Sequence, residues 1–211
     1  MRAKHLPFLS FFRSHTKRSS SYLGREDFYQ SRNVLNVSSS FNFHKDEYFK
    51  NHSTSKEIKF YGVSFGKSEK EIKRIFGKPN FLQKKGLPLD SQVTLFYKLN
   101  IKGIKCILQM HLYENELFFA QIQVRDANPE LRDIFLNLFK LKYKVDDLGW
   151  NETIKDNSGS RIALKDDIVP KASFFTHDIN VWKKIDDEPH HKATQDHTTQ
   201  YQLEKIALRW S

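Results

Sequence analysis

The chain has 211 residues, and its 35 lysines and arginines outnumber 25 acidic residues to give a net charge of +10. This length allows one ordinary domain with extensions, or two small domains. The positive charge favours polyanionic partners such as nucleic acid or anionic lipid, but it does not specify a fold. The single cysteine, Cys106, excludes an intramolecular disulfide and a cysteine-rich zinc site. No apolar run is long enough to span a bilayer.

The first 25 residues are basic and rich in serine, and they contain no acidic residue. This composition is typical of an organelle transit peptide, whereas Leu6 to Phe12 resembles a short secretory signal. Peripheral membrane attachment and a disordered basic tail are further interpretations. We favour a cytoplasmic location and leave cleavage of this segment open. Its cations are the predicted contacts for nucleic acid or anionic membrane, namely Arg2, Lys4, Arg13, Lys17 and Arg18.

Residues 26–55 contain isolated aromatic side chains without sustained periodicity, and we interpret them as a linker. Aromatic residues in such a segment more often pack onto the neighbouring domain than stack on unpaired bases. The prediction is therefore a basic N-terminal arm over residues 1–55 and a single α+β domain over residues 56–211. Two subunits, 57–125 and 128–211, are an alternative division of that domain.

The domain opens with a predicted entry strand around Ile58 and Phe60, followed by a helix with clear ends. Ser68 can cap this helix, and Glu71 three residues later completes a capping box. Gly77 and Pro79 then end it. Ile72, Ile75 and Phe76 form its apolar side.

Three segments with a period of two follow the helix and predict an antiparallel meander. Their apolar residues, such as Leu95, Leu108, Phe118 and Ile122, share one face that needs to be buried under helices. The other face mixes polar and apolar residues, and we expect it to be open. Its polar residues are the candidate binding residues, namely Gln109, His111, Tyr113, Gln121, Gln123 and Arg125.

The second half of the domain begins with a helix that Asn128 caps and Pro129 enters. Its predicted core stripe consists of Leu131, Ile134, Phe135, Leu138 and Leu141. Asp156 to Gly159 predicts a hairpin between strands near Thr153 and at 161–164. Segments 171–177 and 179–185 are expected to add at least one further strand, and Thr199 to Trp210 a short helix.

No standard catalytic motif occurs in the sequence, which lacks a nucleophile elbow, a His-Glu-x-x-His pattern and a dinucleotide-binding glycine fingerprint. The polar run between Glu188 and His197 contains three histidines, but their spacing matches no standard metal site. His111 near Arg125 could act as a general base, although without a visible nucleophile we interpret it as a surface histidine. We therefore predict no cofactor, no metal and no catalytic residue.

The helix and its boundaries resemble a known family. Gly62, Ser68, Glu71 and the run Phe76-Gly77-Lys78-Pro79-Asn80 are similar to the opening helix of the SmpA/OmlA outer-membrane lipoprotein assembly domain. In that family a three-stranded meander follows, as residues 93–125 would here. The resemblance implies a small α+β fold and a non-enzymatic, protein-binding function. The order of elements also permits a pseudo-repeat like that of the β-lactamase inhibitor protein.

The predicted fold is thus α+β, with helices packed on one face of an antiparallel sheet. The first functional hypothesis is a non-catalytic module that presents the mixed sheet face to a protein or peptide. The second is a basic adaptor that binds nucleic acid or anionic membrane through its N-terminal arm. The third is an enzyme whose site is not recognisable in the sequence. The oligomeric state is left open.

Overall fold

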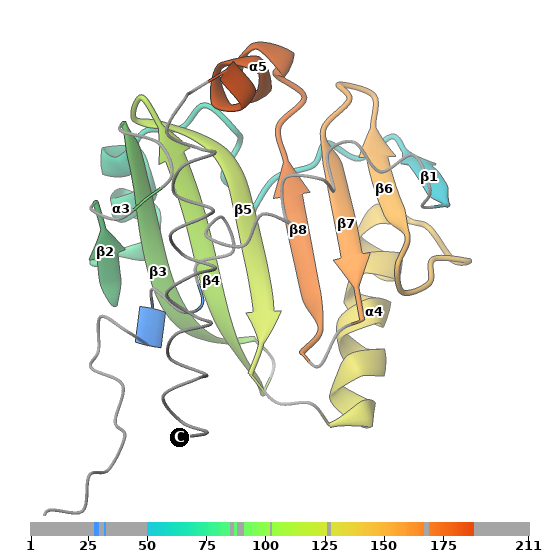
Figure 1. The fold of residues 1–211 in the computed structure, drawn as a ribbon. Coiled ribbons are helices and arrows are strands. Elements are labelled where there is room, and N and C mark those ends of the chain that lie inside the picture. Colours follow the sequence, from blue (N-terminus) through green and yellow to red (C-terminus); the bar gives the residue numbers. More distant parts are fainter. Residues whose placement is uncertain are drawn as a thin grey trace, which may run out of the picture.

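A single eight-stranded sheet forms the centre of the protein (Figure 1). The computed structural model describes residues 28–29, 32, 50–84, 87, 91–101, 103–125, 128–166 and 169–187. The strands are β1 (Asn51–Thr54), β2 (Phe81–Gln83), β3 (Gln92–Ile101), β4 (Ile104–Tyr113), β5 (Glu116–Val124), β6 (Thr153–Asp156), β7 (Arg161–Lys165) and β8 (Lys171–Phe175). The helices are α3 (Glu69–Phe76), α4 (Pro129–Tyr143) and α5 (Ile179–Asp187). The α+β class is as predicted.

The order of strands across the sheet is β1-β6-β7-β8-β5-β4-β3-β2. All neighbouring strands are antiparallel except β1, which pairs in parallel with β6 from Asn51↔Thr153 to Thr54↔Asp156. The sheet is therefore mixed, and the prediction of a purely antiparallel sheet was wrong. The error arose because residues 51–54 lie in the segment interpreted as linker, with little apolar periodicity. The sheet begins before residue 56, where we placed the start of the domain.

Helix α3 has the ends that the sequence predicts. The Ser68 side chain accepts a hydrogen bond from the Glu71 amide, and the Glu71 carboxylate accepts one from the Ser68 amide at 2.9 Å. Gly77 follows the last turn with a φ of 75°, and its amide donates to the Lys73 carbonyl. Ile72 is the fully buried residue of this helix, whereas Ile75 is 56% exposed.

We expect Ser68→Ala to lower the free energy of unfolding by about 1 kcal/mol, because the substitution removes one half of the capping box. Denaturant unfolding monitored by circular dichroism measures the change. Lys70→Ala, at an exposed position of the same helix, is the control and should change stability by less than about 0.5 kcal/mol. An equal effect of both substitutions would contradict the proposed role of the cap.

The predicted meander forms β3, β4 and β5, and a bulge shifts part of it. The pairing moves from His111↔Phe119 to Leu112↔Leu117, so Phe118 is the extra residue of the bulge. Leu117 then lies in the main core, and Phe118 joins a second cluster with Trp182. The prediction that placed Phe118 on the first apolar face was wrong for this reason.

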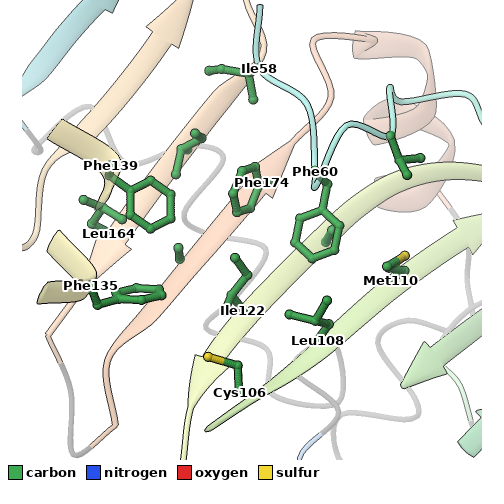
Figure 2. Packing of buried hydrophobic residues seen from close by; sticks show 14 of the residues in the cluster. Ile58, Phe60, Cys106, Leu108, Met110, Ile122, Phe135, Phe139, Leu164 and Phe174 are labelled. Carbon is green, nitrogen blue, oxygen red and sulfur yellow. The ribbon is translucent and has the colours of Figure 1, made fainter. Parts of the chain in front are cut away.

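Helices α3 and α4 cover the same face of the sheet, because Ile72 and Phe135 belong to one core cluster with residues of the central strands. In α4 the buried residues are Phe135, Phe139 and Tyr143, which are spaced four apart. Figure 2 shows Phe135 and Phe139 directed toward the sheet residues Ile122 and Phe174. The predicted stripe was only partly correct, because Ile134 and Leu141 are 38% and 78% exposed.

Of the two C-terminal segments expected to add at least one strand, 171–177 contains β8, whereas residues 179–185 belong to helix α5. The Asp178 carboxylate accepts a hydrogen bond from the Asn180 amide at 2.9 Å and so begins the helix. Trp182 is anchored by a hydrogen bond from its indole nitrogen to the Thr176 carbonyl. The strands predicted near Thr153, at 161–164 and at 171–177 are present as β6, β7 and β8.

Candidate functional site

The mixed sheet face that we expected to be open is mostly buried. Gln109 and His111 are fully buried, Gln121 and Tyr113 are 3% and 8% exposed, and Arg125 alone among the predicted binding residues is exposed. Gln123 is partly buried. The expectation of an open face, and of a surface histidine, was therefore wrong. Strand periodicity separates the two faces of a sheet, but it does not show what lies against each face.

Aromatic residues from outside the sheet cover two parts of this face. Near β3 and β4, Tyr29 stacks on Phe81 with ring centroids 4.9 Å apart, and the Gln109 amide donates to the Arg32 carbonyl at 2.6 Å. Near β5 and β8, Trp182 of α5 packs against Phe118 at 5.5 Å. The packing predicted for aromatic residues of the linker is confirmed for Tyr29, which is 2% exposed.

His111 is buried on this face, beside the polar side chains of Gln92 and Thr94. Its Nδ1 atom is 3.2 Å from both the Gln92 amide nitrogen and the Thr94 hydroxyl. Its Nε2 atom has no hydrogen-bond partner in the part of the chain that the structure describes. Desolvation lowers the pKa of His111 to about 3. The ring is thus neutral at physiological pH and a poor general base.

Several predicted sites fall outside the described residues. These are the polyanion-binding residues Arg2, Lys4, Arg13, Lys17 and Arg18, the histidine-rich run from Glu188 to His197 and the C-terminal helix. Among the described residues, no group of three histidine, cysteine or acidic side chains is arranged to hold a metal. Nor does any helix in the described ranges have the length and apolar character to cross a membrane.

His52 lies between two carboxylates at the β1 edge of the sheet. Its Nε2 atom is 2.7 Å from the Glu152 carboxylate, and its Nδ1 atom is 3.3 Å from the Asp147 carboxylate. The two acids approach opposite ring nitrogens, so they cannot share one metal ion with the ring. Lys50 is paired with Asp147 at 3.0 Å. The cluster connects β1 to the segment before β6 and has a structural role.

An apolar pocket of about 240 Å³ lies between α4 and the sheet, on the face opposite His111. Its floor comes from the sheet, with Cys106, Ile122 and Phe174 facing α4 (Figure 2). Phe135 and Phe139 form the wall on the α4 side. The described residues that line the pocket are Tyr61, Ile101, Ile104, Cys106, Ile122, Phe135, Leu138, Phe139, Lys142 and Phe174.

Tyr61 reaches the pocket from a tight turn with unusual backbone geometry. Phe60 and Val63 exchange both backbone hydrogen bonds at 2.9 Å, which leaves Tyr61 and Gly62 as the two turn residues. Both have a positive φ, 52° for Tyr61 and 81° for Gly62. Such turns normally contain asparagine or glycine at the first position, because a bulky side chain is strained there. The Tyr61 ring packs against Phe60 and Phe76 and is 37% exposed.

The mouth of the pocket is bordered by the exposed side of α4. Leu138 and Lys142 lie four residues apart and both line the pocket. Ile134 and Leu141, at 38% and 78% exposure, extend the apolar surface of the helix next to Leu138. Exposed aliphatic residues beside an apolar pocket are typical of an interaction surface.

Desolvation shifts the pKa values of three ionisable groups in the pocket. Desolvation raises the pKa of Cys106 to about 11, so its side chain stays a thiol. Desolvation, with a smaller effect of the nearby Cys106, raises the pKa of Tyr61 to about 12. Partial burial lowers the pKa of Lys142. Its alkyl stem lines the apolar wall, while the side chain as a whole remains exposed.

The pocket is not visible in the sequence, because its residues come from separate elements. Two local signals were present. First, α4 has more apolar residues than one face can bury, since Leu141 lies outside the face of Phe135 and Phe139. Second, Tyr61 is an aromatic residue in a turn, next to Gly62. Neither signal identifies a site until the packing of α4 on the sheet is known.

Comparison with known proteins identifies no family for this chain. No family model and no curated protein matches the sequence. A cysteine-rich secretory protein from Staphylococcus aureus subsp. aureus Mu50 is similar in structure, with a TM-score of 0.38 and 14% sequence identity. The similarity covers 62% of this chain and 51% of that chain.

Proposed function

We propose that the protein is a non-catalytic interaction module that binds a protein or peptide by enclosing one large apolar side chain of the partner. The pocket between Tyr61 and α4 would receive that side chain. The observation that carries this proposal is the apolar pocket with exposed aliphatic residues at its mouth. The buried state of Gln109, His111 and Gln121 argues against the sheet face as the first contact.

The size of the pocket suits one side chain rather than a longer segment. A cavity of about 150 Å³ holds benzene, so 240 Å³ accommodates a leucine, methionine or phenylalanine side chain. Leu141 and Ile134 would pack around such an anchor and exclude water from it. The strained position of Tyr61 supports the same site, since backbone strain persists where the surrounding structure and function require it.

The chemistry of the lining supports binding rather than catalysis. Cys106 lines the pocket, and its raised pKa keeps its thiol protonated and unreactive. Among the described residues, the lining includes no acidic side chain and no histidine, which are the commonest general acids and bases. The resemblance of residues 62–80 to a protein-binding domain agrees with this proposal.

Peptide selection tests the proposal directly. A random peptide library displayed on phage is selected on the wild-type protein, and the enriched peptides are synthesised and titrated by calorimetry. We expect them to share one large apolar residue. Leu138→Trp, which fills the pocket from α4, should weaken their binding at least tenfold, because an anchor residue typically contributes 2 kcal/mol or more.

The matched controls separate loss of the pocket from loss of folding. Ile179→Ser changes another exposed aliphatic residue, on α5, and is expected to leave peptide binding unchanged. Tyr61→Gly relieves the positive φ and should keep or raise stability while it weakens binding. Equal binding of the peptides to wild type and Leu138→Trp would overturn the proposed site.

We also propose that the domain consists of two related units, each with a helix followed by three strands. The order α3-β3-β4-β5 matches α4-β6-β7-β8, apart from the short strand β2, and the two units meet where β5 pairs with β8. Superposition of residues 69–124 on residues 129–175 is the check. The absence of a common backbone core would contradict the proposal.

A further inference from the structure

Lys142 introduces a positive charge at the pocket that the described part of the chain does not neutralise. Its ammonium lies 5.1 Å from the centre of the Tyr143 ring. No carboxylate of the described residues forms an ion pair with it. Several other cations of the fold are paired, such as Lys67 with Glu71 at 2.8 Å and Lys184 with Glu114 at 2.8 Å. A partly desolvated ammonium is stabilised by an anion beside it.

The end of α4 does not provide that anion. Lys140 and Lys142 both lie in the last turn of the helix. The carboxyl end of a helix carries a partial charge equivalent to about half an elementary charge, so two lysines more than balance it. The site therefore keeps a net positive charge next to an apolar pocket.

The dimensions of the pocket restrict where a ligand can carry its negative charge. Since 240 Å³ encloses one side chain, a negative charge carried by the anchor residue itself must be on its backbone. Within a peptide, the backbone beside a side chain is a neutral amide. At the last residue of a chain it is a carboxylate, and capture of a terminal carboxylate is a known mode of peptide recognition.

We propose that the pocket binds the C-terminal residue of a partner protein, with the apolar side chain inside and the terminal carboxylate paired with Lys142. This inference rests on the proposed function and specifies the chemistry of its ligand. Leu138 and Tyr61 contact the side chain, and Lys142 selects for the free chain end. Internal segments of the same sequence lack the charge and bind less well.

The test uses the peptide Gly-Ser-Gly-Phe as a free acid and as its C-terminal amide, titrated into the full-length protein and followed by NMR. We expect the acid to bind about tenfold more tightly than the amide, the effect of one charge-assisted hydrogen bond. Lys142→Met should reduce the acid-to-amide ratio to about one. Lys142→Arg, which keeps the charge, should retain the preference, and so should Lys140→Met.

The outcomes separate this inference from the proposed function. Equal binding of acid and amide to the wild-type protein would overturn recognition of the chain end and leave the apolar anchor site intact. Binding of neither peptide would overturn recognition of a chain end and also count against the anchor site, which the phage-selected peptides test independently. Decanoate is a third probe. If it binds more tightly than the peptide acid and depends on Lys142, the ligand is a fatty acid and a protein partner is ruled out.

Discussion

Asp156→Ala is expected to lower the free energy of unfolding by about 3 to 5 kcal/mol, the largest effect that we predict for a polar residue. Asp156 is 6% exposed. Its carboxylate accepts hydrogen bonds from the amides of Ser158 at 2.9 Å and Ser160 at 3.0 Å, and from that of Ile58 at 2.8 Å. Alanine removes the acceptor and leaves the buried amides of Ile58 and Ser160 unpaired, at about 1 to 3 kcal/mol for each.

The hydrogen bond from the Ile58 amide is a long-range contact of Asp156. It connects the β6–β7 turn to the segment between β1 and α3, 98 residues away in sequence. Asp156→Asn keeps one carbonyl oxygen and should cost less than alanine. Asp147→Ala removes an exposed carboxylate that is paired with Lys50 and should cost far less than Asp156→Ala, because solvent screens an exposed ion pair. Urea unfolding measures all three, and a similar small cost for Asp156→Ala and Asp147→Ala would contradict this account.

The second large effect is a loss of stability in weak acid that depends on His111. The pKa of His111 is about 3 in the folded protein and about 6.5 in an unfolded chain. Between these values the unfolded state binds a proton that the folded state does not bind. The free energy of unfolding therefore falls as the pH decreases below 6.5. Lowering the pH from 7 to 5 should cost about 2 kcal/mol through this one residue.

His111→Leu isolates that contribution, because carboxylates elsewhere in the protein also affect stability in acid. Urea unfolding at pH 7 and pH 5 should give a difference that is smaller by about 2 kcal/mol for His111→Leu than for wild type. Thr94→Val is the control, since it removes the hydroxyl that contacts the His111 ring and keeps the titrating group. It should retain the wild-type difference. An unchanged difference in His111→Leu would show that the ring is protonated in the folded protein.

Part of the candidate site could be predicted from the sequence. The apolar face of the meander was predicted with Leu108 and Ile122 on it, and both are in the core. Cys106 belongs to the same core cluster and is 1% exposed. What could not be predicted is the space between these residues and α4, because it depends on the distance at which Phe135 and Phe139 pack on the sheet.

Lys142 and Tyr61 illustrate the same limit for the polar part of the site. A lysine near the end of a helix is ordinary in sequence, since cations are favourable there. Its position beside an apolar pocket follows only from the packing of α4 against β4, β5 and β8. Tyr61 precedes Gly62, a residue type common in turns, but its ring meets Phe76 only after α3 folds back onto the sheet.

By itself the sequence determined the local structure of this protein, which includes the capped helix α3, the strands β3 to β5 and the alternation that gives the sheet two faces. These features depend on hydrogen bonds and side-chain directions within a few residues. The tertiary structure alone decided the parallel pairing of β1, the burial of His111 on the second face and the pocket beside Lys142. Each of these depends on contacts between segments far apart in the chain, and residue periodicity contains no information about which surfaces will meet.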